Sequence, residues 1–335
     1  MKLLERSLLV LSSLLLASST AAAADRPAIN TRLFGTRAIV ACDPVEKTCG
    51  LAVISFPAGV SGLVPYGRSD VAVASMYIPS VDDANAIISR IDSGETPQAA
   101  VDAVMAADPY GAYRQLAAVK LQPDGTVSVG QRTGEESSDF RCSIKGATYV
   151  VQANNQTTAD MCRVMAQAFD KAKGSLPQRL FASLKAGSRV GGDRNGDRSG
   201  VIRAWNSTDE SAFYTHVIAD AVTHVSSTAI RDLEIQLNRY QGGIAVTYAA
   251  DLVPLDRENT KLVKHALHKL GYYHGPMDAS WPASAEQALA DFVWNNLFFE
   301  KPTVEVNGVR KIDGVLVNYL RDADLGALIP ATPAQ

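Results

Sequence analysis

The sequence has few of the residues on which metal-framed and disulfide-framed folds depend. Its 335 residues include four cysteines and five histidines, too few for either kind of framework, although one or two disulfides remain open. Lys and Arg number 32 against 35 Asp and Glu, so no basic excess points to a nucleic-acid partner. The remaining composition is that of an ordinary globular protein, and the length favours about two domains.

No apolar run reaches the roughly 18 residues that a membrane-spanning helix needs. A shorter run at the N-terminus, Leu8–Ala17, follows Lys2 and Arg6 and precedes the small residues Ser18–Ala24. This order is typical of a signal peptide that is removed during export. We therefore predict a signal peptide over residues 1–24, no membrane span after its removal, and a protein exported to the periplasm or secreted.

Export permits disulfides. Cys42 and Cys49 flank a short polar turn, so we predict that they pair across a hairpin. Cys142 and Cys162 could form a second pair, but four cysteines allow three connectivities and the sequence does not choose among them. Four buried free thiols are the alternative.

Alternating or apolar segments bounded by turn residues predict strands, and helical spacing after a capping residue predicts helices. The expected strands are Ala38–Ala41, Gly50–Ser55, Val71–Met76, Ala117–Leu121, Thr126–Gly130, Thr148–Gln152, Val201–Trp205, Phe213–Ile218 and Ile244–Tyr248. The expected helices are Asp82–Ile91, Thr96–Ala106, Thr158–Ala172 and Pro177–Ala186. This order predicts an α/β (α+β) fold with sheets and helices in separate layers.

The segment Asp251–Asn259 is polar and contains Pro254, so we place a domain boundary there. The first domain is expected over residues 36–250. A small, mainly helical domain is expected over residues 257–325.

The dipeptide Gly35-Thr36 opens the first expected strand. In N-terminal nucleophile (Ntn) hydrolases, a threonine at such a place attacks a carbonyl with its hydroxyl, and its own α-amine acts as the base. The amine exists only if the bond after Gly35 is cut, so residues 25–35 would be a propeptide.

A family resemblance strengthens this interpretation. The segment Thr36–Pro44 (TRAIVACDP) resembles the opening of the bacterial "domain of unknown function 1028" family, an Ntn-hydrolase-like family with the approximate pattern TFSIVARDP. Further matching segments, in chain order, are Gly50–Val53, Val64-Pro65 with Arg68, Ala107–Pro109, Tyr113–Gln115, Thr133-Gly134, Gln152–Asn154 and Gly191–Ser199. The resemblance implies a four-layer αββα sandwich and, through the superfamily, amide-bond hydrolysis.

The resemblance also assigns residues. Thr36 takes the place of the nucleophile, and the side-chain amide of Asn154 could donate to a developing oxyanion. Groups in the glycine-rich loop could position the amine and relay its proton: Asp193, Asp197 and Ser199. Arg68 and Arg114, which lie in matching segments, are assigned to substrate binding.

Two departures from the family pattern favour an inactive protein. Phe56 follows Ser55 where the family usually has a basic residue that would help to keep the amine neutral. Ala153 replaces a glycine. The alternative function is therefore a non-catalytic periplasmic binding or scaffold protein on the same fold.

Other interpretations of these residues are weaker. The run Asp193–Asp197 begins like a calcium loop, but Arg198 and Ala204 stand where Gly and Glu are needed. His265, His268 and His274 lack the supporting ligands of a zinc site. A Ser-His-Asp triad remains open, although no nucleophile-elbow motif is present. We therefore predict no metal and no cofactor.

The C-terminal segment resembles peptidoglycan-binding domains. The resemblance rests on Leu270–Tyr273, on Gly275–Trp281 and on the helix expected to open with a capping box at Ser284. Three aromatic side chains could stack on sugar rings, with the domain's own core as the alternative place for them: Tyr272, Tyr273 and Trp281.

Together these features predict an exported N-terminal-threonine amidohydrolase held near the cell wall. Its partners would be a small amide or peptide substrate and peptidoglycan, without nucleic acid. The identity of the substrate stays open, as does assembly into a homo-oligomer.

Overall fold

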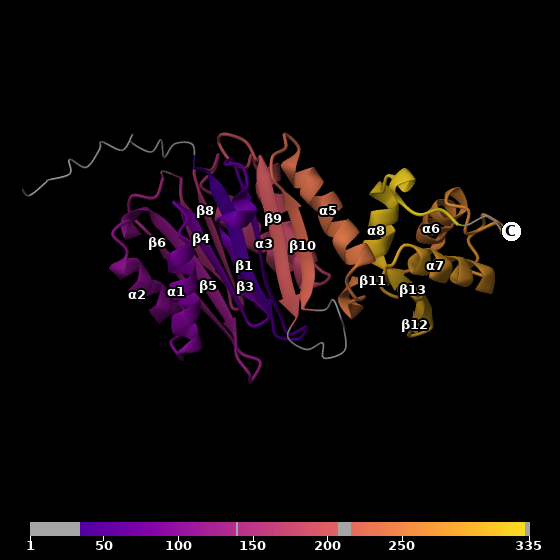
Figure 1. Ribbon diagram of the computed structural model, residues 1–335, viewed down its shortest axis with the longest axis horizontal. Coiled ribbons are helices and arrows are strands. Elements are labelled where there is room, and N and C mark those ends of the chain that lie inside the picture. Colours follow the sequence, from indigo (N-terminus) through magenta and orange to yellow (C-terminus); the bar gives the residue numbers. More distant parts are fainter. Residues whose placement is uncertain (1–33, 139, 207–215, 332–335) are drawn as a thin grey trace, which may run out of the picture. The chain divides into compact units, whose positions relative to one another are not determined.

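The computed structural model describes residues 34–138, 140–206 and 216–331 (Figure 1). The expected signal peptide lies outside the described residues, as does the expected propeptide up to residue 33. In the part of the chain that is described, none of the helices has the length and apolar character to cross a membrane.

The larger sheet of the first domain has six antiparallel strands in the order β10-β9-β2-β1-β8-β7. The strands are β1 (Thr36–Asp43), β2 (Thr48–Ser55), β7 (Cys142–Lys145), β8 (Tyr149–Asn154), β9 (Ser199–Asn206) and β10 (Val217–Thr223). Strand β1 is therefore central. Its alternating side chains reach both faces of the sheet, with Val40 in the core between the sheets and Ile39 in the core under the helices.

A second antiparallel sheet faces the first, in the order β3-β4-β5-β6. Its strands are β3 (Pro65–Arg68), β4 (Val71–Tyr77), β5 (Arg114–Leu121) and β6 (Val127–Thr133). Helices α1 (Val81–Asp92) and α2 (Pro97–Ala107) cover its outer face (Figure 1). Their N-termini are capped by the hydroxyls of Ser80 and Thr96.

Three helices cover the outer face of the six-stranded sheet: α3 (Met161–Lys171), α4 (Leu176–Arg189) and α5 (Ala229–Gly243). Apolar clusters fill the space between the two sheets and the space under each helical layer. The order of layers is therefore α-β-β-α, and the predicted fold class is confirmed.

The C-terminal domain has a small sheet in the order β11-β13-β12, with β11 (Leu252–Pro254), β12 (Val304–Val306) and β13 (Val309–Asp313). Its helices are α6 (Arg257–Lys269), α7 (Ala283–Asn295) and α8 (Gly314–Asp322). Short 3₁₀ helices lie at Val60–Gly62, Gly111–Tyr113, Ala249–Asp251 and Leu325–Ala327.

The sequence-based assignment of elements was wrong in places. The expected strand Ile244–Tyr248 is irregular. The two glycines before it, Gly242 and Gly243, pack closely against the side chains of Tyr319 and Phe298. Helix α5 and the short strands β3 and β7 were not predicted. Of the expected strand Phe213–Ile218, residues 213–215 lie outside the described residues and the rest begins β10.

The expected capping box at Ser284 also differs. The N-cap residue of α7 is Pro282, without a side-chain cap. The carboxylate of Glu286 accepts instead from Thr303 N at 2.9 Å and from Trp281 Nε1 at 2.6 Å. It therefore joins the start of α7 to the loop before β12.

The predicted Cys42–Cys49 disulfide is present between the directly paired strands β1 and β2. A second disulfide, Cys142–Cys162, joins the edge strand β7 to α3.

A buried lysine links α5 to the C-terminal domain. Lys301 is 2% exposed and donates to the carbonyl oxygens of Gln241 and Ala245 and to the carboxylate of Asp313, at 3.0, 2.8 and 2.7 Å. Asp313 in turn caps the N-terminus of α8. The segment Asp251–Asn259, predicted to separate two domains, contains β11 and the start of α6.

Glu46, in the turn between β1 and β2, accepts a hydrogen bond from Leu176 N at the start of α4. Burial raises the pKa of Glu46 from 4.5 to about 7. The folded protein therefore holds a proton that the unfolded chain releases between these pH values. Stability from this group is present at low pH and is lost as the pH rises toward 7.

We expect the Tm of the wild type to fall between pH 4.5 and 8, and Glu46→Gln to flatten that fall because glutamine does not titrate. Thermal unfolding across this pH range measures it. Glu305→Gln, an exposed residue, is the matched control and should follow the wild type. An equal pH slope in Glu46→Gln would show that Glu46 does not carry the effect.

Candidate active site

Four polar residues form a row across the end of the six-stranded sheet. Thr36 of β1 is paired directly with Asn154 of β8 and Ser55 of β2, and Ser55 is paired with Ser199 of β9. Directly paired residues point to the same face of a sheet, here the face toward the second sheet. All four side chains are buried. The row therefore brings together hydroxyl and amide groups at one end of the sheet, where these strands begin or end.

Thr36 is held on both sides. Its backbone N–H donates to Asn154 Oδ1 at 3.1 Å, and its Oγ1 lies 2.8 Å from Ser55 Oγ. The amide nitrogen of Asn154 donates to Gln115 Oε1 at 2.8 Å. As the residue lies, Asn154 therefore holds the Thr36 nitrogen and does not present its amide as an oxyanion donor.

The carbonyl oxygen of Gly35 accepts two hydrogen bonds. Phe56 N donates at 3.0 Å and Ser55 Oγ at 2.8 Å. A serine hydroxyl has a single proton to donate. Since Ser55 uses it on Gly35, the hydroxyl of Thr36 must be the donor to Ser55. The result is a directed chain from Thr36 Oγ1 through Ser55 Oγ to the Gly35 carbonyl oxygen.

An ion pair lies under this row, on the helix-covered face of the sheet, with Arg37 fully buried and the side chain of Asp197 15% exposed. Arg37 donates from two nitrogens to both carboxylate oxygens of Asp197, at 2.6 Å each, and also to Ser188 of α4. Burial alone would raise the pKa of Asp197, but the Arg37 hydrogen bonds and charge hold it below its usual value. The pair anchors the glycine-rich loop to β1.

Asp193, in the same loop, lies beside Gly35. One carboxylate oxygen, Oδ1, accepts from Asn195 N at 2.8 Å, while Oδ2 is buried and has no hydrogen-bond partner among the described residues. Burial raises the pKa of Asp193 to about 7. Near neutral pH this carboxyl group can therefore give or take a proton.

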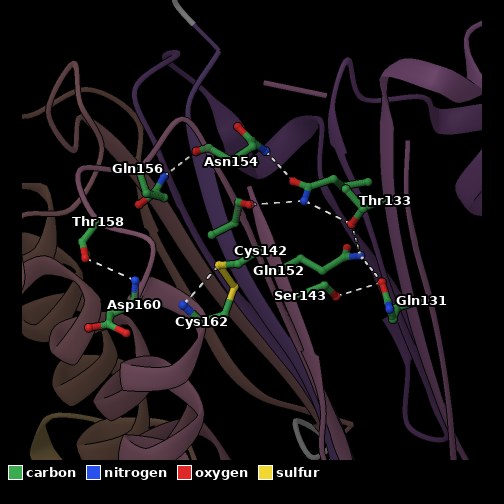
Figure 2. The surroundings of a disulfide bond; sticks show 12 residues. Gln131, Thr133, Cys142, Ser143, Gln152, Asn154, Gln156, Thr158, Asp160 and Cys162 are labelled. Atoms are coloured by element: carbon green, nitrogen blue, oxygen red, sulfur yellow. Dashed lines mark hydrogen bonds between the residues drawn. A yellow bond between two sulfur atoms is a disulfide. The ribbon is translucent and has the colours of Figure 1, made fainter. Parts of the chain in front are cut away.

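A ladder of buried amides supports Asn154 (Figure 2). Gln152 donates to Gln131 Oε1 at 3.2 Å, and Ser143 donates to the same oxygen at 2.8 Å. Gln115, the partner of Asn154, donates to Thr133 Oγ1 at 3.3 Å. Figure 2 also shows the Cys142–Cys162 disulfide beside this ladder, where it ties β7 to α3.

The structure thus places the sequence-predicted residues in three settings. Thr36, Asn154 and Ser199 share the row, and Asp193 lies against Gly35. The Ser199 hydroxyl is used in a turn, since it donates to Pro57 O at 2.6 Å and accepts from Val60 N at 3.3 Å. Asp197 lies on the opposite face of the sheet, on Arg37.

Sequence reasoning did not assign roles to Ser55, Gln115 or Arg37. Arg37 could have been noticed as a charge inside an otherwise apolar strand, which requires a buried partner. Nothing in the sequence indicated the contacts of Gln115, because they join two sheets.

The two arginines assigned to substrate binding are engaged in ion pairs. Arg68 is paired with Asp70 and Asp92 at 2.9 and 2.5 Å. Arg114 is buried and paired with Asp108 at 2.6 Å. A cation does approach Phe56, because the guanidinium carbon of exposed Arg198 lies 5.3 Å from the centre of its ring.

The aromatic residues of the C-terminal domain differ in exposure. Tyr273 is 1% exposed and belongs to the domain core, so its ring cannot stack on a sugar. Tyr272 is half-buried and packs edge-on against Phe292. Trp281 is half-buried and lines a groove of about 650 Å³, together with Arg310.

The histidines lie apart from this groove. His265, His268 and His274 are exposed, and His268 Nδ1 lies 2.9 Å from Tyr273 O. Within the described ranges, no group of three or more His, Cys, Asp or Glu side chains is arranged to hold a metal ion.

Residues 36–230, more than half of the chain, match the family described as "Family of unknown function (DUF1028)". The chain belongs to this family. Residues 249–320 match the domain described as "Putative peptidoglycan binding domain". The comparison with curated proteins gives no match.

A crystal structure of a protein of the same family from Silicibacter pomeroyi is similar to this chain, with a TM-score of 0.53 at 24% identity. The similarity covers 60% of this chain and 86% of that one. At this identity it shows a shared fold. The peptidoglycan-binding match and the two disulfides indicate a cell-wall-related or extracytoplasmic location.

The Arg37–Asp197 pair should dominate the stability of the site. Arg37→Met leaves a carboxylate buried without its counter-charge, at an expected cost of about 3–5 kcal/mol in unfolding free energy. Arg37→Met/Asp197→Asn should recover part of that loss, because no charge is then unpaired. Urea unfolding at pH 7 measures both.

Arg163→Met, which breaks an exposed pair with Asp160, is the control and should cost less than about 1 kcal/mol. Equal losses for Arg37→Met and Arg163→Met would contradict the importance of burial.

Proposed function

We propose that the protein is an exported N-terminal-threonine amidohydrolase that cuts its own chain between Gly35 and Thr36. The observation that carries this proposal is the pair of hydrogen bonds to the Gly35 carbonyl oxygen, combined with the Thr36 hydroxyl that begins the same chain of hydrogen bonds. Donors aimed at a carbonyl oxygen stabilise the negative charge that develops there on attack.

The self-cleavage proceeds by an acyl shift. Thr36 Oγ1 attacks the carbonyl carbon of Gly35, while its proton passes through Ser55 Oγ to the carbonyl oxygen. The carbon–nitrogen bond then breaks and the nitrogen takes up the proton, which leaves an ester on Thr36 Oγ1 and a free α-amine. Water hydrolyses the ester, releases a chain ending at Gly35 and restores the hydroxyl.

In the mature protein the α-amine of Thr36 serves as the base. Its reference pKa of about 7.7 leaves part of it neutral near neutral pH. Asn154 Oδ1, which accepts from the same nitrogen in the uncut chain, would orient the amine toward the hydroxyl. An external amide then takes the place of the Gly35 carbonyl, and the same acyl-ester step follows.

Thr36→Ala should abolish processing, because no hydroxyl remains to attack Gly35. Intact-mass measurement of protein recovered from the periplasm is expected to give a wild type that begins at Thr36 and a variant that is longer by the residues up to Gly35. Thr36→Ser keeps the hydroxyl and is the matched control.

The alternative is a binding or scaffold protein without catalysis. It requires that wild type and Thr36→Ala differ only by the mass of the substitution. That result would overturn the proposed hydrolase.

We propose further that the groove beside Trp281 is the surface that binds peptidoglycan. The domain match supports this partner, and the half-buried ring borders the groove with its Nε1 fixed on Glu286. A fixed ring can stack on a sugar at little cost in side-chain entropy.

Trp281→Ala should lower co-sedimentation of the intact protein with purified peptidoglycan by about tenfold, equivalent to about 1.4 kcal/mol. Trp281→Phe, which keeps a ring, should retain most of the binding. Trp294→Ala removes a ring that is 80% exposed beside a different groove and is the control. Loss of binding in Trp294→Ala alone would place the surface there instead.

A further inference from the structure

The position that a Cβ atom of residue 35 would take is already occupied by the side chain of Asp193. A Cβ atom added there would lie 1.7 Å from Asp193 Oδ2 and 2.4 Å from Asp193 Cγ. Contacts under about 3.0 Å require that something moves. The backbone of Gly35 is not in the left-handed region. Glycine is therefore required here by space rather than by its backbone conformation.

Asp193 is poorly placed to move aside. It is 3% exposed, its Oδ1 accepts from Asn195 N, and its own N–H donates to Asp197 Oδ1 at 3.3 Å. Asp197 is fixed by Arg37. Asp193 also forms an antiparallel β-bridge with Gln156. The carboxyl group thus forms a firm wall beside the acyl carbon that Thr36 would attack.

The carboxyl group of Asp193 would restrict which substrates bind as well as which leader residue is cut; this step rests on the proposed function. The ester formed during self-cleavage joins Thr36 Oγ1 to a glycyl carbonyl. A substrate cut on the carboxyl side of glycine gives the same glycyl ester. A substrate with an L-residue at that position would place its Cβ atom against Asp193.

We propose that the protein hydrolyses amide bonds on the carboxyl side of a glycyl residue and excludes L-residues that carry a side chain. Asp193 is the specificity-determining residue, and it acts by occupying the place of the first side-chain carbon. The leaving amine is not constrained by this contact.

Processing tests the wall directly. The time course of cleavage, followed by intact mass after cell-free synthesis, should be about 10- to 100-fold slower in Gly35→Ala, which corresponds to a clash of about 1.4–2.7 kcal/mol. Phe34→Ala, one residue earlier, is the matched control and should be cut at nearly the wild-type rate. Equal rates for the wild type and Gly35→Ala would overturn the proposal.

Asp193→Ala distinguishes the steric effect of the Asp193 side chain from any effect that its carboxyl group has on the rate of cleavage. This change can itself slow cleavage, so the measured quantity is the factor by which Gly35→Ala slows cleavage, taken once in the wild-type background and once in the Asp193→Ala background. We expect this factor to fall close to one in the Asp193→Ala background, because the wall is gone. A factor unchanged by Asp193→Ala would show that another group excludes the side chain.

External substrates provide the second readout. For the processed wild type, kcat/KM should be at least about tenfold higher for N-acetylglycyl p-nitroanilide than for N-acetyl-L-alanyl p-nitroanilide, by the same clash. Equal values would overturn the specificity while leaving the hydrolase in place. A wild type that is not cut at Gly35–Thr36 would overturn the hydrolase itself, and this proposal with it.

Discussion

The site depends on one constraint, which is that Thr36 is the first residue of a central strand. Neighbouring strands β2 and β8 pair with β1 from that residue onward. A residue at the start of an edge strand would have one partner and could fray. Thr36 has Ser55 on one side and Asn154 on the other, so its hydroxyl and its nitrogen are both fixed by groups that the sheet itself positions.

The two faces of β1 differ in what they carry: the proposed nucleophile lies on one face and a supporting ion pair on the other. Thr36 points into the space between the sheets, next to the apolar cluster there and to Asn154, whose amide donates to Gln115. Arg37 points to the helices and ties the glycine-rich loop to the strand through Asp197. Because Thr36 and Arg37 are adjacent in sequence, the ion pair of Arg37 with Asp197 also fixes the position of the glycine-rich loop relative to Gly35. Asp193 is thereby held against the bond that would be cut.

Much of this arrangement could be predicted from the sequence. Alternation and turn residues indicated β1 and β2, and the family resemblance indicated the layers and Thr36. The roles of Gln115 and of Ser55 as a hydrogen-bond relay could not be predicted, because they depend on register and on contacts between sheets. Tyr273 was assigned to sugar binding because it is aromatic and lies in the segment that resembles peptidoglycan-binding domains, with the domain's own core as the alternative. In a small domain a large ring is needed for the core, where Tyr273 lies 1% exposed.

Removal of the leader would also change the electrostatics of the site. In the uncut chain Asp193 faces an uncharged glycine, and burial raises its pKa to about 7. Cleavage would create an α-amine at the neighbouring nitrogen, with a reference pKa of about 7.7. Two groups so close titrate as a pair, because an ionised carboxylate favours the protonated amine. The base form of Thr36 would then be most available when Asp193 is itself protonated. One buried carboxyl group would thus link the shape of the acyl site to the protonation of its nucleophile.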